Sequence, residues 1–259
     1  MAAETRGGTE NAGTDAEKQT IDAFTRFMGT IKEIISKINM ELPAAVKLVA
    51  VSKFHPFDAI EQAYQAGQRV FAESRPQELL AKVGRLEEIR VERGDPGYMA
   101  DIRWHFIGHL QTNKLKMVLP YVSLVQSVDS VRLLDAIQGW ASSNGKIINV
   151  LLEPHVAAEQ TKQGFAADEI YEILQNKPAY PNICFCGIMG MATFTDDLSV
   201  IRSDFEALRE IFDTCRSRYP SLENDFTEFS VGMSDDYPIA IEYGSTMVRI
   251  GSMIFGARN

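Results

Sequence analysis

The sequence has few cysteines, no long apolar run and no excess of positive charge. Its three cysteines, two of them the pair Cys184 and Cys186, are too few for a disulfide framework and indicate a reducing compartment. No stretch approaches the roughly 20 apolar residues of a membrane span, and the N-terminus has no apolar signal core. The net charge of −9 argues against binding to nucleic acid or anionic lipid. We therefore expect a cytoplasmic protein that binds neither nucleic acid nor membrane.

Composition and length favour one large domain. Hydrophobic residues make up 45% of the 259 residues, which is enough for a substantial core. Residues 1–18 are small and polar, which predicts a flexible N-terminal tail. Because no change of composition divides residues 19–259, we expect them to form a single domain. The apolar spacing from Ile21 to Ile35 predicts an amphipathic helix ahead of the first strand.

Short apolar runs alternate with helical patterns along the rest of the chain. The predicted strands are 47–53, 69–74, 103–108, 122–129, 148–156, 183–192, 228–233 and 246–256. The predicted helices are 58–66, 75–93, 111–119, 130–143, 165–177, 198–218 and 235–243, the first of them ending at Gly67. Continuously apolar strands are typical of a parallel sheet covered on both faces. Eight of them separated by helices predict an α/β fold, a single (β/α)8 TIM barrel, with an open doubly wound sheet as the alternative.

Lys53 follows the first apolar run directly. In a barrel of this type the active site lies at the C-terminal ends of the strands, where this side chain would lie. A lysine there could simply reach solvent. The functional alternative is a lysine that forms a Schiff base with an aldehyde.

The C-terminal stretch 228–258 is rich in glycine and serine. Its glycines leave backbone N–H groups open, and such groups bind phosphate after strands 7 and 8 of many barrels. Ser234, followed by Asp235 and Asp236, also resembles the start of a helix, which favours an anion. Tight turns and helix caps are the structural alternative for each residue taken singly.

Arg249 lies in the middle of the last predicted strand, on the same face as Met247 and Gly251. A buried guanidinium needs a polar partner. Either a salt bridge to Glu73 or Glu153, or an acceptor atom of a ligand, would supply it.

The remaining polar candidates favour structural roles. His105 and His109, with the nearby Gln111 and Asn113, are interpreted as a hydrogen-bonded core histidine and polar loop residues, because no grouping has metal-ligand spacing. At strand spacing Cys184 and Cys186 share a face, and we interpret them as small core residues. We therefore expect no metal site.

Several motifs occur together in an order typical of one family. "AVSK" with Lys53, "WHFIGHLQTNK", "EQTKQGF", "GMSDD" and "GSTMVRIGSMIFGAR" follow one another along the chain. From about residue 20 to 258 the sequence resembles the pyridoxal phosphate homeostasis proteins, the one-domain relatives of the alanine racemase N-terminal barrel. The second and last motifs, "WHFIGHLQTNK" and "GSTMVRIG", are the more specific ones.

The resemblance implies a cofactor and a set of contacts. Lys53 would form a Schiff base with pyridoxal 5′-phosphate, and Arg249 would lie against the pyridine nitrogen. The implied phosphate-binding residues are Ser230, Gly251 and Ser252, with the backbone of Met233 and Thr246 nearby. The implied function is a non-catalytic carrier or buffer in pyridoxal phosphate homeostasis, with apo pyridoxal phosphate enzymes as recipients. For the oligomeric state we expect a monomer, with a weak dimer as the alternative.

A pyridoxal phosphate-dependent racemase is the alternative function. In the racemases that this barrel resembles, a tyrosine from a C-terminal β domain supplies a second acid–base group. Because the sequence ends at Asn259, soon after the last strand, we expect that domain to be absent and racemisation to be slow. His155 and Tyr237 are candidates for a substitute base.

The sequence departs from the common family pattern in two stretches. "FAESRPQE" places Glu73, Ser74 and Arg75 where Glu-Asn-Tyr is usual, and His155 replaces an asparagine. Both stretches are expected near the cofactor, so the resemblance does not predict which residues contact the side of the pyridine ring.

Overall fold

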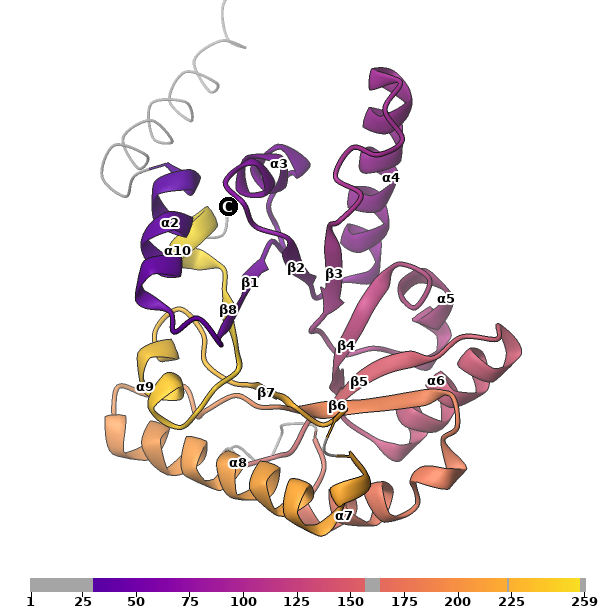
Figure 1. Ribbon diagram of the computed structural model, residues 1–259, viewed down its shortest axis with the longest axis vertical. Coiled ribbons are helices and arrows are strands. Elements are labelled where there is room, and N and C mark those ends of the chain that lie inside the picture. The colour runs from indigo at the N-terminus through magenta and orange to yellow at the C-terminus, as the bar shows by residue number, and fades with distance from the viewer. Residues whose placement is uncertain (1–29, 157–163, 223, 257–259) are drawn as a thin grey trace, which may run out of the picture.

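Eight parallel strands form a closed barrel in sequence order (Figure 1). The computed structural model describes residues 30–156, 164–222 and 224–256. Closure results from parallel pairing of the last strand with the first. The strands are β1 (Lys47–Val51), β2 (Val70–Glu73), β3 (Arg103–Phe106), β4 (Val122–Val128), β5 (Ile148–Leu152), β6 (Ile183–Met189), β7 (Glu228–Ser230) and β8 (Met247–Ile250). The predicted barrel is confirmed, and each strand lies within its predicted range.

Helices in the connections cover the outside of the barrel (Figure 1). The α-helices are α2 (Ile31–Glu41), α3 (Phe57–Gln65), α4 (Pro76–Arg93), α5 (Leu115–Val118), α6 (Val131–Ser143), α7 (Ala167–Gln175), α8 (Leu198–Arg218), α9 (Tyr237–Glu242) and α10 (Ser252–Phe255). The 3₁₀ turns are η1 (Thr112–Lys114), η2 (Lys177–Ala179) and η3 (Pro220–Leu222). Every helix of the described segments is too short or too polar to cross a membrane.

Local sequence signals explain where the helices begin and end. Helix α4 begins with Pro76, whose missing N–H is harmless in the first turn, and ends at Gly94 with φ of 61°. Helix α3 ends just before Gly67, whose φ of 100° favours glycine, as the sequence predicts. Asp197 accepts a hydrogen bond from the Ser199 backbone N–H at 2.9 Å and caps α8.

The first predicted helix and the last predicted strand differ in extent from those in the structure. The strand predicted over 246–256 stops at Ile250, and α10 follows it, because an apolar run alone does not distinguish a buried strand from a short buried helix. Residues 1–29, which include the predicted tail and the start of the predicted first helix, lie outside the described residues. Helix α2 continues beyond the expected end at Ile35 and packs against α10 (Figure 1).

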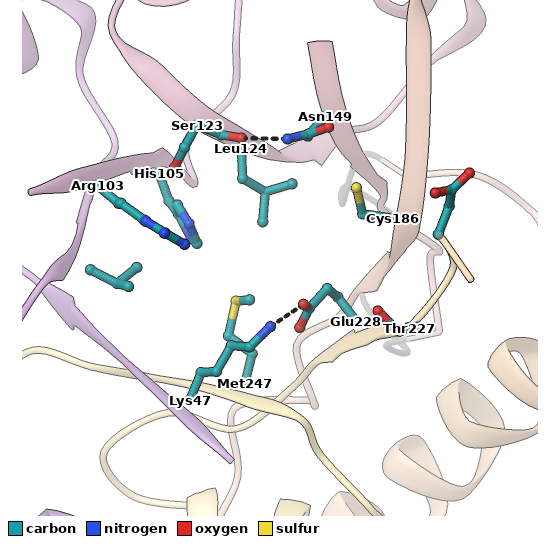
Figure 2. Close-up of a pocket in the computed structure, with 12 residues that line it drawn as sticks. Lys47, Arg103, His105, Ser123, Leu124, Asn149, Cys186, Thr227, Glu228 and Met247 are labelled. Carbon is teal, nitrogen blue, oxygen red and sulfur yellow. Dashed lines mark hydrogen bonds and ion pairs between the residues drawn. The ribbon is translucent and has the colours of Figure 1, made fainter. Parts of the chain in front are cut away.

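Inside the barrel, apolar layers alternate with polar side chains. The apolar residues are Val49, Val51, Ala72, Leu124, Leu151, Met189 and Met247. At the N-terminal mouth of the barrel lies a cavity of about 220 Å³, where Arg103 and His105 face the ion pair of Lys47 with Glu228 (Figure 2).

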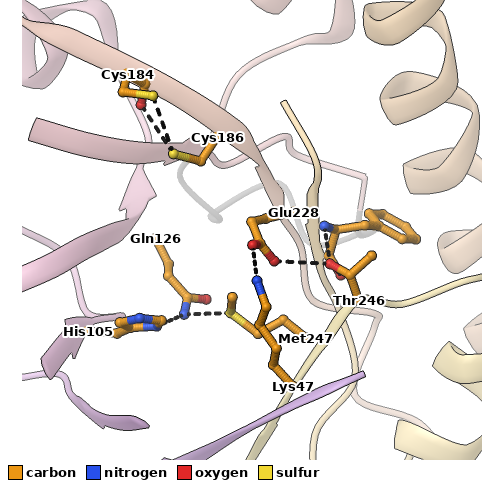
Figure 3. Close-up of polar contacts among 9 residues, drawn as sticks. Lys47, His105, Gln126, Cys184, Cys186, Glu228, Thr246 and Met247 are labelled. Atoms are coloured by element: carbon orange, nitrogen blue, oxygen red, sulfur yellow. Dashed lines mark hydrogen bonds and ion pairs between the residues drawn. The ribbon is translucent and has the colours of Figure 1, made fainter. Parts of the chain in front are cut away.

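His105 and Gln126 connect this mouth to the middle of the barrel (Figure 3). The Gln126 amide nitrogen donates to His105 Nδ1 at 2.8 Å, so the neutral ring carries its proton on Nε2. Burial lowers the pKa of His105 to about 3, and the positive charges of Lys47 and Arg103 act in the same direction. The interpretation of His105 as a hydrogen-bonded core histidine is confirmed.

His105 should make the protein less stable in mild acid. Between pH 6.5 and 3 the unfolded chain binds a proton at this histidine while the folded protein does not, so stability should fall as pH falls. The loss should reach about 2 kcal/mol at pH 5 relative to pH 8. Urea unfolding at both pH values of the wild type and His105→Gln should show this part of the pH dependence disappear in the variant. His155→Gln serves as the control and should retain it; equal pH dependence in wild type and His105→Gln would contradict the assignment.

Candidate functional site

A second cavity, of about 340 Å³, opens at the C-terminal mouth of the barrel. Loops after several strands contribute to it, as in other barrels of this type. Its walls are formed by Val51, Lys53, Phe54, His55, Ile107, Met189, Met191, Phe194, Met233, Ser234, Asp235, Arg249, Gly251, Ser252 and Gly256. The volume is within the usual range for small-molecule sites, about 300–1,000 Å³.

Lys53 enters this cavity because of strand alternation. Val49 and Val51 of β1 point into the barrel, so the residue two positions later continues on the same side. Directly after it, Phe54 adopts φ of 69°, and its N–H donates to Glu78 Oε2 at 2.8 Å. The strand therefore ends in a constrained turn that holds the half-buried lysine at the mouth.

A buried ion pair supports the strand end from behind. Lys82 Nζ lies 2.5 Å from Glu73 Oε1 and donates to the Ser52 carbonyl at 2.7 Å. The Ser52 hydroxyl donates to Glu73 Oε1 at 2.6 Å, and all three side chains are buried. Burial raises the pKa of Glu73, whereas Lys82 lowers it. The backbone next to Lys53 is thus held in place by this ion pair and its hydrogen bonds to Ser52, as well as by strand pairing.

Arg249 forms part of the cavity wall on the strand that closes the barrel. Its guanidinium donates to the Ser230 carbonyl at 2.6 Å, to the Ser230 hydroxyl at 2.7 Å and to the Gly190 carbonyl at 2.8 Å. Burial lowers its pKa to about 10, while Glu153 and Asp236 act to raise it. Arg249 therefore remains a cation at neutral pH. Of the two salt-bridge partners considered, Glu73 instead pairs with Lys82.

Hydroxyl groups gather on the wall formed by the loops after β7 and β8. The hydroxyls of Ser234 and Ser252 lie 3.0 Å apart, next to Gly251. Asp236 accepts from the Met233 backbone N–H at 2.5 Å and so closes the turn that presents Ser234. Serine hydroxyls beside a cation and a lysine are suited to an anionic group.

Comparisons with known proteins show which family this chain belongs to. The sequence model of the alanine racemase N-terminal domain matches residues 28–259. The pyridoxal phosphate homeostasis protein of Haemophilus influenzae is 36% identical over 214 residues, which are 83% of this chain and 86% of that protein. The chain belongs to the pyridoxal phosphate homeostasis protein family. The human member is 35% identical over 237 residues, which are 88% of this chain and 83% of that protein.

Solved structures show the same fold. PipY of Synechococcus elongatus, determined without pyridoxal phosphate, has a TM-score of 0.79 at 31% identity and covers 88% of this chain and 100% of its own. PipY with pyridoxal phosphate bound has a TM-score of 0.77 at 30% identity, with the same coverage. An alanine racemase of Clostridium difficile has a TM-score of 0.67 at 14% identity over 88% of this chain and 56% of the racemase, which shows a shared barrel fold.

The structure brings most of the family's implied residues to one cavity. Lys53, Met233, Arg249, Gly251 and Ser252 all line it. Their convergence from β1, β7 and β8 follows from closure of the barrel, because these strands are neighbours.

Thr246 and Ser230 are not among the residues that line this cavity. Thr246 precedes β8 at the opposite end of the barrel, where its Oγ1 accepts from the Phe229 N–H at 2.8 Å. The four residues of β8 lie between it and Gly251, and the five steps along the strand span roughly 16 Å. Ser230 is fully buried, and its hydroxyl donates to Gln126 Oε1 at 2.7 Å.

The structure also changes the expected roles of Met233 and Tyr237. The Met233 backbone N–H is already donated to Asp236, so this residue contributes its side chain to the cavity rather than a backbone donor. Tyr237 points away from the cavity and donates to Glu41 of α2 at 2.8 Å, which removes it as a candidate base.

The residues that depart from the family pattern lie beside or below the cavity rather than in its wall. Arg75 lies over the Phe54 ring, 4.5 Å from its centroid, and pairs with Glu78 at 3.3 Å. The Ser74 backbone lies so close to Gly108 that a Cβ atom at position 108 would be 2.1 Å from the Ser74 carbonyl oxygen. The His155 N–H donates to the Phe165 carbonyl at 2.9 Å in the loop after β5.

Sequence reasoning missed His55 and the apolar rim. His55 lines the cavity and packs against Phe255 with the rings tilted and their centroids 5.2 Å apart, and burial is the main cause of its lowered pKa. Met191 and Phe194 line it from the loop after β6, and Phe194 is 91% exposed. The position of His55, two residues after Lys53 at the end of β1, is the signal that could have indicated it.

Removing Lys82 should destabilise the fold strongly. Lys82→Met leaves Glu73 as an unpaired buried carboxylate, which should reduce the free energy of unfolding by about 3–5 kcal/mol. The double variant Glu73→Gln with Lys82→Met should recover most of this loss, because no isolated charge remains. Urea unfolding at pH 7 measures both, and exposed Lys37→Met should change stability by less than about 0.5 kcal/mol. A loss in Lys82→Met no larger than in Lys37→Met would show that the buried pair contributes nothing.

Proposed function

We propose that this chain binds pyridoxal 5′-phosphate in the C-terminal cavity, through a Schiff base with Lys53, and buffers or delivers it without catalysis. The observation that carries the proposal is the convergence of Lys53, the buried cation of Arg249 and the hydroxyl pair of Ser234 and Ser252 in one cavity. Its membership of a family of homeostasis proteins supports the same function.

The residues of the cavity fit the parts of this cofactor. When bound, the cofactor supplies an aldehyde, which a primary amine captures reversibly. Among the described residues that line the cavity, Lys53 carries the primary amine, and the hydroxyls of Ser234 and Ser252 with the Gly251 backbone would hold the phosphate. Apolar walls from Ile107 and Met189 exclude water from the flat face of a ring.

Arg249 has a definite chemical role in this proposal. A guanidinium donates hydrogen bonds and does not accept them, so a pyridine nitrogen beside it would stay unprotonated. An unprotonated ring is a weaker electron sink, which disfavours carbanion chemistry. The residue therefore favours storage of the cofactor over turnover of amino acids.

The racemase alternative depends on a second acid–base group. Among the described residues that line the cavity, His55 and Asp235 are the side chains able to exchange a proton besides Lys53. His155 and Tyr237, the substitutes considered from the sequence, do not line it. Apo pyridoxal phosphate enzymes are the recipients in this proposal, and a cytoplasmic location completes it.

Lys53 should carry the cofactor alone. Borohydride reduction of the protein loaded with pyridoxal phosphate, followed by peptide mapping, should place the label on the peptide that contains Lys53. Lys53→Ala should lose the visible absorption band of the Schiff base and remain folded by circular dichroism. Lys114→Ala is the matched control and should keep both the band and the label. A label that stays on another lysine at equal occupancy in Lys53→Ala would refute the assignment.

The loaded protein should not exchange the α-proton of amino acids at an enzymatic rate. Holoprotein incubated with L-alanine in deuterated buffer should retain its α-proton signal by NMR, because Arg249 opposes carbanion formation. Exchange at about 1 per second or faster, lost in Lys53→Ala and reduced in His55→Gln, would favour the racemase. Transfer of the absorption band to an apo enzyme, measured in parallel, tests delivery directly.

A further inference from the structure

Cys184 and Cys186 lie on β6 near the N-terminal mouth of the barrel, at the end of the strand opposite the cofactor cavity (Figure 3). Their sulfur atoms are 3.7 Å apart, and the Cys186 thiol points toward the Cys184 sulfur. Both side chains are partly exposed, whereas Cys215 is fully buried in α8. All three cysteines are free thiols in the structure.

Strand β6 has a bulge at Cys186. In a regular strand, residues i and i+2 are separated by roughly 6.6 Å, close to the upper limit of about 6.8 Å between the Cα atoms of a disulfide. Here Phe185 pairs with Val150 and Gly187 pairs with Leu151, so Cys186 is the extra residue of the bulge. Gly187 has φ of 148° and approaches β7 so closely that a Cβ would lie 1.8 Å from the Glu228 carbonyl oxygen.

The surroundings of the pair distinguish the two thiols. The hydrogen bond from Cys186 lowers the pKa of Cys184 to about 7, and the same contact raises the pKa of Cys186. Lys177 acts in the same direction on Cys184, while Asp225 and partial burial oppose it. Cys184 is therefore the thiol with the larger thiolate fraction at neutral pH, and Cys186 is the adjacent partner.

We infer that Cys184 and Cys186 form a reversible intramolecular disulfide when the protein meets a hydroperoxide. The sulfurs need to approach by about 1.7 Å to reach bonding distance. The disulfide closes a very small ring within one strand, and strained disulfides of this kind are readily reduced again.

The chemistry is that of a peroxide-sensing pair. The Cys184 thiolate attacks one oxygen of hydrogen peroxide, the O–O bond breaks, and the leaving hydroxide takes a proton to become water. Cys184 is now a sulfenic acid. The Cys186 sulfur attacks the Cys184 sulfur, the S–O bond breaks, and the leaving hydroxide takes the Cys186 proton. In total two thiols are oxidised, and one peroxide is reduced to two waters.

Mass spectrometry of the full chain tests the inference. The folded protein is treated with hydrogen peroxide, unfolded in urea and alkylated with N-ethylmaleimide. The expected product is a monomer that takes up one maleimide, at Cys215, whereas the untreated protein takes up three. The peptide containing both cysteines should be lighter by two hydrogen atoms, and dithiothreitol should restore three maleimides.

Single variants separate the two roles. In Cys186→Ser the sulfenic acid should persist, and dimedone should label Cys184 alone. Cys215→Ser, the matched control, should form the disulfide as the wild type does. The inference is overturned if peroxide leaves all three thiols intact, if the disulfide joins two chains, or if the pair proceeds to sulfinic acid without an internal bond. None of these readouts depends on cofactor binding.

Discussion

The buried guanidinium of Arg249 constrains the interior of this barrel more than any other group. A cation removed from water requires polar partners on every side, since an uncompensated buried charge is strongly destabilising. The carbonyls of Gly190 and Ser230 supply part of this compensation from β6 and β7, and the Ser230 hydroxyl passes the polar contact on to Gln126. Gln126 in turn needs His105 in its neutral form. The charge of Arg249, near the C-terminal mouth, thus determines the hydrogen bonding of side chains as far as His105 at the N-terminal mouth.

The strands could be predicted from the sequence for a simple physical reason. Both faces of a parallel barrel strand are covered, so each strand is a compact apolar run that the intervening polar segments set apart. Closure of the barrel then places the C-terminal ends of the first and last strands side by side, which brings Lys53 and Arg249 together. That convergence follows from topology alone. The short helix after β8 did not follow, because one serine and three apolar residues fit either conformation.

The finer contacts of the site depend on information that a linear pattern does not contain. Ser230 and Ser234 are similar residues four positions apart, yet one is below the cavity with its proton engaged and the other faces it. Thr246 belongs to the same motif as Arg249 and lies at the far end of the strand. A sequence motif groups residues that lie close together along the chain. Whether they can contact the same ligand depends on which end of the strand each of them occupies. The sequence likewise did not show that β6 would have a bulge at Cys186.

The left-handed conformation of Phe54 has a consequence for variation at the base of the site. A bulky residue at φ of 69° holds the chain in a region that costs about 1–2 kcal/mol relative to ordinary backbone. Glycine would relieve that strain, but it would also remove the ring on which Arg75 stacks and free the chain after Lys53 to sample other directions. This position therefore cannot have both a less strained backbone and a Lys53 side chain that is held in one direction. A chain optimised for thermal stability alone would favour glycine here and would lose the fixed direction of Lys53.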